Sequence, residues 1–147
     1  MEREYIMAIL VVYWTGTGNT EIMAEKIYEG IQSVGVEAEL KLIDQVSPSD
    51  IDNYEKIAFG CPSMGIEELE PDEFLPWYEE IEPLLGDKLI ALFGSYGWGE
   101  GEWMDAWHER VRALGLNLFE EGIRISSTPS TKEQQMIFEF GQRFAQK

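Results

Sequence analysis

The chain has 147 residues, 44% of them hydrophobic and 27% charged, which fits a single globular domain over residues 1–147. Its 28 acidic and 11 basic side chains give a formal net charge of −17, which repels nucleic-acid phosphates and anionic membrane surfaces and disfavours both as partners. The single cysteine excludes an intramolecular disulfide and a multi-cysteine metal site, so we expect no metal and a reducing, cytoplasmic environment.

The first third of the chain alternates between strand and helix patterns. The continuous, β-branched run at 6–13 predicts a central strand buried on both faces, and it is too short to span a bilayer. Apolar residues at every third or fourth position over 20–34 predict an amphipathic helix that ends before Gly35. Alternating apolar and charged residues over 36–42 predict a second strand nearer the sheet edge.

The alternation continues to the end of the chain. Further strands are predicted at 56–60, 88–93 and 117–125, and further helices at 71–85 (in part), 102–114 and 132–146. A strand followed by a helix, repeated five times, is typical of a parallel sheet with right-handed crossovers and helices on both faces. In such sheets a ligand binds beyond the carboxyl ends of the strands, so the loops after the first, third and fourth strands are the candidate site.

The loop after the first strand, TGTGNT at Thr15–Thr20, has the composition of a phosphate site. Its small residues let backbone N–H groups converge on an anion at a helix N-terminus. It lacks the lysine of a Walker A loop, and Glu21 stands where a dinucleotide-binding fingerprint needs its third glycine. Three threonine hydroxyls and the Asn19 amide suit a single phosphate monoester, whereas a plain glycine turn with a helix cap is the alternative.

The other two loops offer surfaces for a flat ring. In GSYGWGEG, after the fourth strand, Trp98 stands between two glycines, which leave the chain free to present an indole face. In GCPSMGIEELE, after the third strand, Met64 provides a polarizable surface for an aromatic ring, with ordinary core packing as the alternative.

Four other residues are expected to be structural. Trp103 and Trp107 are four positions apart in a helical stretch, which favours packing on one helix face. Cys61 has no neighbour that would lower its thiol pKa, so a buried, inert thiol is expected. His108 is the only histidine, so it cannot form a metal site alone, and we expect it at the surface or partly packed.

Together, the loops TGTGNT, MGIEE and GSYGWGEG resemble the cofactor loops of the flavodoxin family, over essentially the whole chain. In detail, YWTGTGNT, GCPSMG and LFGSYGWGEGEWMDAW are similar to the short-chain flavodoxins of anaerobic bacteria. The resemblance implies an α/β three-layer sandwich with a five-stranded parallel sheet in the order 2-1-3-4-5. It also implies a cytoplasmic, monomeric electron carrier that holds FMN non-covalently and is not an enzyme.

The resemblance further implies a role for each loop. Thr15–Thr20 would bind the FMN phosphate, Trp98 would stack on one face of the isoalloxazine, and Met64 would cover the inner face. The Glu67 carboxylate would accept the flavin N3–H, and backbone groups of two glycines would reach the polar edge of the ring. The residues expected to bind FMN are Thr15, Gly16, Thr17, Gly18, Asn19, Thr20, Met64, Gly65, Ile66, Glu67, Ser95, Tyr96, Gly97, Trp98 and Gly99.

The negative charge of the chain predicts a low reduction potential. One carboxylate about 10 Å from the ring, at an effective dielectric of about 40, opposes an added electron by roughly 0.8 kcal/mol before screening. The resemblance implies shuttling between semiquinone and hydroquinone, with the semiquinone N5–H bound by the Gly65 carbonyl after a peptide flip. Ile66 departs from the small, polar or acidic residue usual in relatives. We expect it to penalise that turn, which requires φ > 0, and to weaken the semiquinone.

Two other functions on this topology fit the residues less well. A small FMN-dependent quinone or nitro-compound reductase would need a nicotinamide and substrate pocket, for which the sequence has no insertion. A phosphorelay receiver would need carboxylates after the first strand and an aspartate after the third, and neither is present. If the acidity does more than confer solubility, the expected partners are redox proteins with basic docking surfaces, namely reductases and low-potential oxidoreductases.

Overall fold

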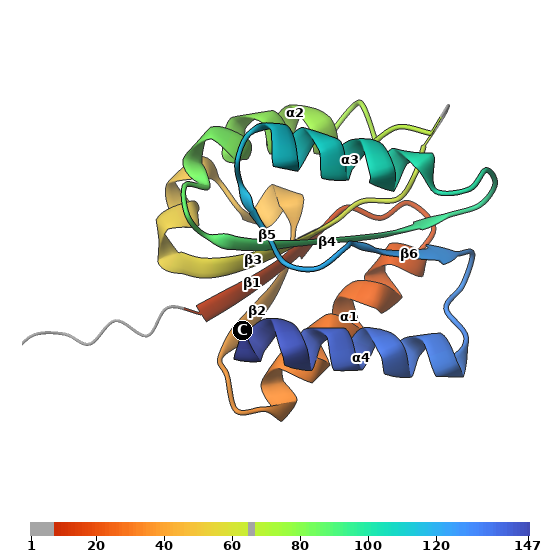
Figure 1. Cartoon of the computed structure of the whole chain (residues 1–147), viewed down its shortest axis with the longest axis horizontal. Coiled ribbons are helices and arrows are strands. Elements are labelled where there is room, and N and C mark those ends of the chain that lie inside the picture. The colour runs from red at the N-terminus through yellow and green to blue at the C-terminus, as the bar shows by residue number, and fades with distance from the viewer. Residues whose placement is uncertain (1–7, 65–66) are drawn as a thin grey trace, which may run out of the picture.

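The computed structural model describes residues 8–64 and 67–147 and forms one parallel sheet between two layers of helices (Figure 1). The strand path is β2-β1-β3-β4-β5, as predicted, and a sixth strand, β6, also pairs with β4. All pairings are parallel. The strands are β1 (Ala8–Tyr13), β2 (Ala38–Leu42), β3 (Tyr54–Gly60), β4 (Leu89–Tyr96), β5 (Asn117–Leu118) and β6 (Ile123–Ser126). The expectations for Gly65 and Ile66 lie outside the described residues.

The α-helices of the described residues are divided between the two faces of the sheet. They are α1 (Asn19–Ser33), α2 (Phe74–Ile81), α3 (Glu102–Ala113) and α4 (Thr131–Gln146). Helices α2 and α3 cover one face, and α1 and α4 cover the other (Figure 1). The predicted three-layer α/β sandwich is therefore confirmed. None of the helices within the described ranges is long and apolar enough to cross a membrane.

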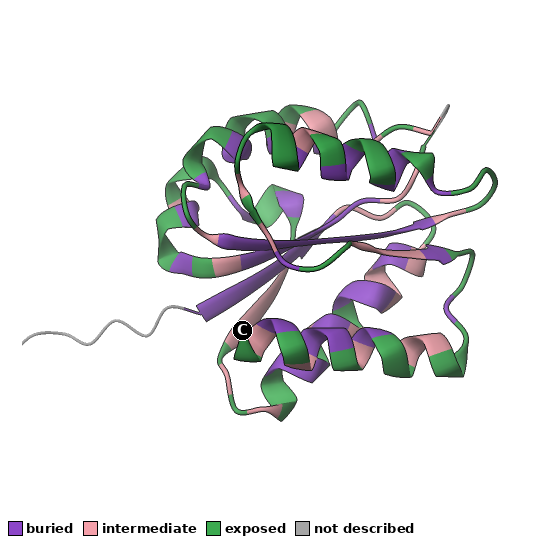
Figure 2. Cartoon of the chain, in the orientation of Figure 1, coloured by how far each residue is buried: buried purple, intermediate pink, exposed green. Residues whose placement is uncertain are grey.

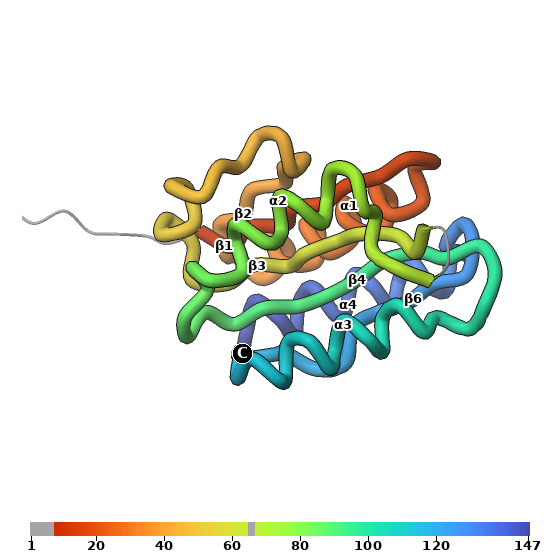
Figure 3. Tube along the Cα trace, turned by 90° about the horizontal axis from the view of Figure 1, so that it is seen from above, coloured from red at the N-terminus to blue at the C-terminus, as the bar shows by residue number. Residues whose placement is uncertain are grey.

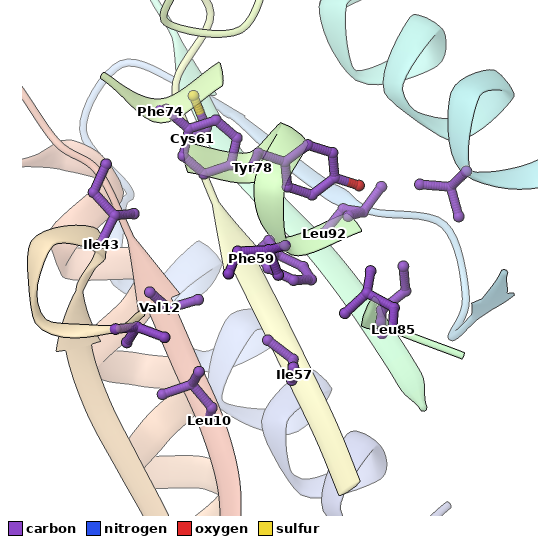
Figure 4. Packing of buried hydrophobic residues seen from close by; sticks show 14 of the residues in the cluster. Leu10, Val12, Ile43, Ile57, Phe59, Cys61, Phe74, Tyr78, Leu85 and Leu92 are labelled. Atoms are coloured by element: carbon purple, nitrogen blue, oxygen red, sulfur yellow. The ribbon is translucent and has the colours of Figure 1, made fainter. Parts of the chain in front are cut away.

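The apolar run of β1 supplies both halves of the core. Successive side chains of a strand point to opposite faces, so Leu10 and Val12 pack under α2 and α3, whereas Ile9 and Val11 pack against α1 and α4. All six residues of β1 are buried, and the central strands in Figure 2 are purple accordingly. Figure 4 shows the first of these two clusters, in which residues of β1, β3 and β4 meet Phe74 and Tyr78 of α2.

The predicted fifth strand is interrupted. Residues 117–125 form two short strands because the chain leaves the sheet between them. Phe119 turns into the core beside Phe140 and Phe144, with both pairs of ring centroids 5.3 Å apart. Glu120 has a φ of 48° and receives two hydrogen bonds from Arg143, at 3.0 and 2.9 Å. Packing of Phe119 in the core and the ion pair of Glu120 with the distant Arg143 thus accompany the break in the strand.

The prediction for His108 was wrong, because this side chain is buried, with only 3% of its surface exposed. Its Nε2 accepts a hydrogen bond from the backbone N–H of Gly122 at 2.8 Å, which joins α3 to the start of β6. Burial, reinforced by the charges of Arg112 and Arg124, lowers the pKa of the imidazole below its ordinary value of 6.5. The neutral ring is therefore a structural acceptor.

Two glycines allow α1 and α4 to pack backbone to backbone. A Cβ at Gly30 would collide with the carbonyl oxygen of Phe138, and a Cβ at Gly141 would collide with that of Ile27. Neither helix could approach so closely with a larger residue at these positions.

We predict that Gly30→Ala destabilises the protein by about 1–3 kcal/mol, because the added methyl group forces α1 and α4 apart. This sign opposes helix propensity, which favours alanine over glycine by roughly 0.5–1 kcal/mol. Urea unfolding followed by circular dichroism measures the difference. The exposed control Glu25→Ala should change stability by less than about 0.5 kcal/mol. A stabilised Gly30→Ala variant would contradict the close packing.

We also predict a pH dependence that originates at His108. Because the unfolded chain binds a proton at this position more readily than the folded chain, the free energy of unfolding falls as the pH drops from 6.5 toward the lower pKa of the folded state. His108→Gln keeps an acceptor but cannot be protonated. The stability lost between about pH 7.5 and about pH 5 should therefore be smaller in this variant than in the parent protein. Identical pH profiles would show that His108 is protonated equally in both states.

Candidate functional site

A hollow of about 360 Å³ opens at the edge of the sheet where β1, β3, β4 and β6 end, and we call it the site hollow. The loops that follow these strands gather at the right-hand end of Figures 1 and 3. The residues that line it are Gly16, Thr17, Asn19, Pro62, Ser63, Met64, Ser95, Tyr96, Gly97 and Ser127. The three loops singled out in the sequence therefore meet at one place.

The loop after β1 is shaped by its glycines and its own hydroxyls. Gly18, with a φ of 100°, immediately precedes α1 and allows the sharp entry into the helix. The Gly18 N–H donates to Thr15 Oγ1 at 3.0 Å, so Thr15 braces the loop from within. Thr17 and Asn19 line the site hollow next to the first turn of α1, whose N–H groups have no partners inside the helix. This combination favours an anion.

Of the three threonines of this loop only Thr17 lines the site hollow, and Thr20 lies deepest. It is buried, it does not line the site hollow, and its hydroxyl lies 3.0 Å from that of Ser95 at the end of β4. This pair of hydroxyl groups connects α1 to β4, the strand that precedes the loop 97–101.

Two residues of the loop after β3, Met64 and Glu68, are joined by a pair of backbone hydrogen bonds. The Met64 N–H donates to the Glu68 carbonyl at 2.8 Å, and the Glu68 N–H donates back at 3.1 Å. The Met64 side chain is 37% exposed and lines the site hollow, which excludes simple core packing for this residue.

Glu67 carries an unsatisfied carboxylate oxygen. Its Oε1 accepts the Trp103 N–H at 3.1 Å, whereas its Oε2 is buried without a hydrogen-bond partner among the described residues. Oε2 lies so close to Gly99 that a Cβ there would collide with it. Glu67 does not line the site hollow but a separate pocket beside α3, together with Trp103 and Trp107. Its expected contact with the flavin N3–H therefore stays a prediction.

The tryptophans divide as predicted. Trp98, in the loop 97–101 between β4 and α3, is 66% exposed, whereas Trp103 and Trp107 are each only 1% exposed. Gly97 lines the site hollow. Trp98 and Gly99, which follow it in the sequence, do not. Cys61 is buried, and burial raises the pKa of its thiol, as expected for an inert structural residue.

A fourth loop, which follows β6, was missed by the sequence analysis. Ser127 lines the site hollow with a φ of 62°, and its N–H donates to the Tyr96 carbonyl at 2.8 Å. The Thr128 hydroxyl donates to the side-chain oxygen of Asn19 at 2.9 Å. The cluster SSTPS between a strand and a helix was the available signal, because it marks a loop at a strand end.

Comparison with known proteins agrees with this geometry. A family model described as Flavodoxin matches residues 11–141. The flavodoxin of Clostridium beijerinckii is 42% identical over 135 residues, which cover 92% of this chain and 97% of that protein. The solution structure of two-electron reduced Megasphaera elsdenii flavodoxin superposes with a TM-score of 0.81 at 37% identity, covering 92% of this chain and 98% of that one.

A longer protein contains a similar segment. The flavo-diiron protein FprA2 of Clostridium acetobutylicum is 32% identical over 93% of this chain, but the match covers only 35% of that protein. The relatives matched along nearly their full length are flavodoxins of about the size of this chain. The chain therefore belongs to the flavodoxin family, whose members bind FMN and carry electrons.

Proposed function

We propose that this flavodoxin is a low-potential one-electron carrier of the cytoplasm, which works between the one-electron-reduced and fully reduced forms of its FMN. The observation that carries the proposal is the site hollow itself, where the loops after β1, β3 and β4 bring Thr17, Met64 and Gly97 together. The net charge of −17 opposes the addition of an electron to a ring held there. The single buried thiol fits a reducing compartment.

The residues at the site fit FMN. Its phosphate has a place at the loop 15–20, where Thr17, Asn19 and the N-terminus of α1 face the site hollow. We assign its ring to the space between Met64, which lines the site hollow, and the exposed Trp98, with the backbone of Gly97 at its polar edge. The remaining expected contacts, at Gly65 and Ile66, lie outside the described residues.

FMN, when bound, supplies the capacity to take up and release single electrons. The protein decides how strongly an added electron is held. A carboxylate at Glu67, in a chain with a net charge of −17, opposes the extra negative charge of the reduced ring. Each further carboxylate of the neighbourhood adds a smaller, salt-screened contribution of the same sign. A strongly reducing carrier follows.

The same charge selects the partners. We propose that a monomer of this chain docks transiently on redox proteins with basic surfaces, because opposite charges speed encounter without requiring tight binding. The exposed Trp98 places an aromatic surface at the rim of this acidic molecule. Stepwise dithionite reduction of the purified protein tests the carrier. Long-wavelength absorbance of the one-electron-reduced flavin should appear and then vanish, whereas sustained NAD(P)H oxidation without a partner would indicate a reductase instead.

We predict that Thr17→Ala weakens binding of FMN but not of riboflavin, which has the same ring and no phosphate. A hydrogen bond to a charged group contributes about 1.5–3 kcal/mol, so the dissociation constant for FMN should rise at least about tenfold. Fluorescence titration of the apoprotein with each flavin measures both constants. Equal losses for the two flavins would place the phosphate elsewhere.

We predict that Glu67→Gln raises the potential of the second electron step, because it removes a negative charge from the ring while it keeps an acceptor for the Trp103 N–H. The rise should reach at least about 35 mV, the equivalent of roughly 0.8 kcal/mol in a one-electron step. Spectroelectrochemical titration measures it. Glu109→Gln, an exposed change of the same charge on α3, is the matched control. Equal shifts in the two variants would remove Glu67 from the ring.

A further inference from the structure

The loop 97–101, which carries Trp98, depends on contacts from outside itself. Three of its five residues are glycines, so holding its backbone in one conformation costs more entropy than for an ordinary loop. Two of these glycines, Gly99 and Gly101, have φ values of 83° and 84°. A well-placed indole at Trp98 therefore requires anchors on the loop.

Arg124 of β6 holds the far end of this loop. Its Nη1 donates to the Gly101 carbonyl oxygen at 2.8 Å, and its Nη2 donates to Asp105 Oδ1, in the first turn of α3, at 2.6 Å. A Cβ added at Gly101 would lie 2.6 Å from Arg124 Cδ, so the aliphatic part of the arginine also packs against the loop backbone. The guanidinium thus spans the junction between loop and helix.

The backbone of Arg124 is itself fixed by the sheet. β6 pairs with β4 so that Arg124 stands opposite Gly94, three residues before the loop begins. The arginine side chain then crosses from the base of the loop to its end. Glu67 holds the same loop from another side, through its contact with Gly99 and its hydrogen bond to the Trp103 N–H.

Charge pairing alone does not explain this arrangement. The Asp105 side chain is 61% exposed, and an ion pair with so exposed a partner adds little stability. The Gly101 carbonyl is the more informative contact, because only a forked, planar donor reaches it and the carboxylate together. Loss of the Arg124 side chain should therefore change the conformation of the loop 97–101 more than the free energy of unfolding of the protein.

We propose that Arg124 is a positioning residue for the flavin ring: it holds the loop 97–101 so that Trp98 is presented for stacking, and it does not itself touch the ring. The proposal rests on the stacking role given to Trp98 under the proposed function. The known part of the site lies on the loops after β1, β3 and β4. Through the side chain of Arg124, β6 also contributes indirectly to binding of the flavin ring.

The test compares FMN binding in Arg124→Ala, Arg124→Lys and Arg143→Ala. Arg143 is the matched control, because it makes a similar forked pair with Glu120 away from the site hollow. Arg124→Ala should raise the dissociation constants of both FMN and riboflavin about tenfold, since the ring and not the phosphate loses its support. Arg124→Lys should recover less than half of that loss, and Arg143→Ala should leave both constants within about twofold. Full rescue by lysine would assign the effect to charge and overturn the proposal.

A double-mutant cycle with Trp98→Ala separates this inference from the proposed function. If Arg124 acts through Trp98, Arg124→Ala has no further effect on flavin binding once Trp98 is alanine. Additive losses, or an unchanged affinity in Arg124→Ala alone, would overturn the role of Arg124 and leave the stacking of Trp98 intact. An unchanged affinity in Trp98→Ala would overturn the stacking role itself. Urea unfolding of the apoproteins should place Arg124→Ala within the range of Arg143→Ala, and a markedly less stable Arg124→Ala would indicate a general structural role instead.

Discussion

Parallel pairing of the three central strands is the constraint from which the rest of this molecule follows. Tyr13 of β1 stands opposite Gly60 of β3, and Gly60 stands opposite Phe93 of β4, so the three strands reach one row together. The backbone pairing continues past that row, with the Cys61 N–H on the Phe93 carbonyl and the Ser63 N–H on the Ser95 carbonyl. Loops that are far apart in the sequence therefore leave the sheet side by side, already aligned.

Around that row, polar contacts connect the loops into one unit. Thr20 and Ser95 join the loop 15–20 to the end of β4, and Thr128 joins the loop after β6 to Asn19. Glu67 and Arg124, which have opposite charges, contact the loop 97–101 and the start of α3 from two sides. A flavin bound here meets a prearranged surface, which lowers the entropy cost of binding.

The sequence predicted the parts of this structure that depend on local pattern. The apolar run of β1 and the amphipathic helices have a periodicity that indicates one kind of element, and the structure has these elements, with the glycine-rich loops at the strand ends as predicted. The parts that were missed depend on partners far along the chain. The buried His108 is hydrogen-bonded to Gly122, Glu120 in the break of the last strand pairs with Arg143, and Ser127 reaches the site hollow because β6 pairs with β4. No local pattern contains these contacts.

The interruption of the last strand has a consequence for how this fold can change. β5 and β6 each pair with β4 on their own, so the register of one does not fix the register of the other. Between them, Glu120 and Glu121 are exposed at the surface, clear of the site hollow. Because loop closure becomes only slowly more costly with length, extra residues between Glu120 and Glu121 would add little entropic cost. At this break the chain can therefore be lengthened without a change in the pairing that β4 offers to either strand.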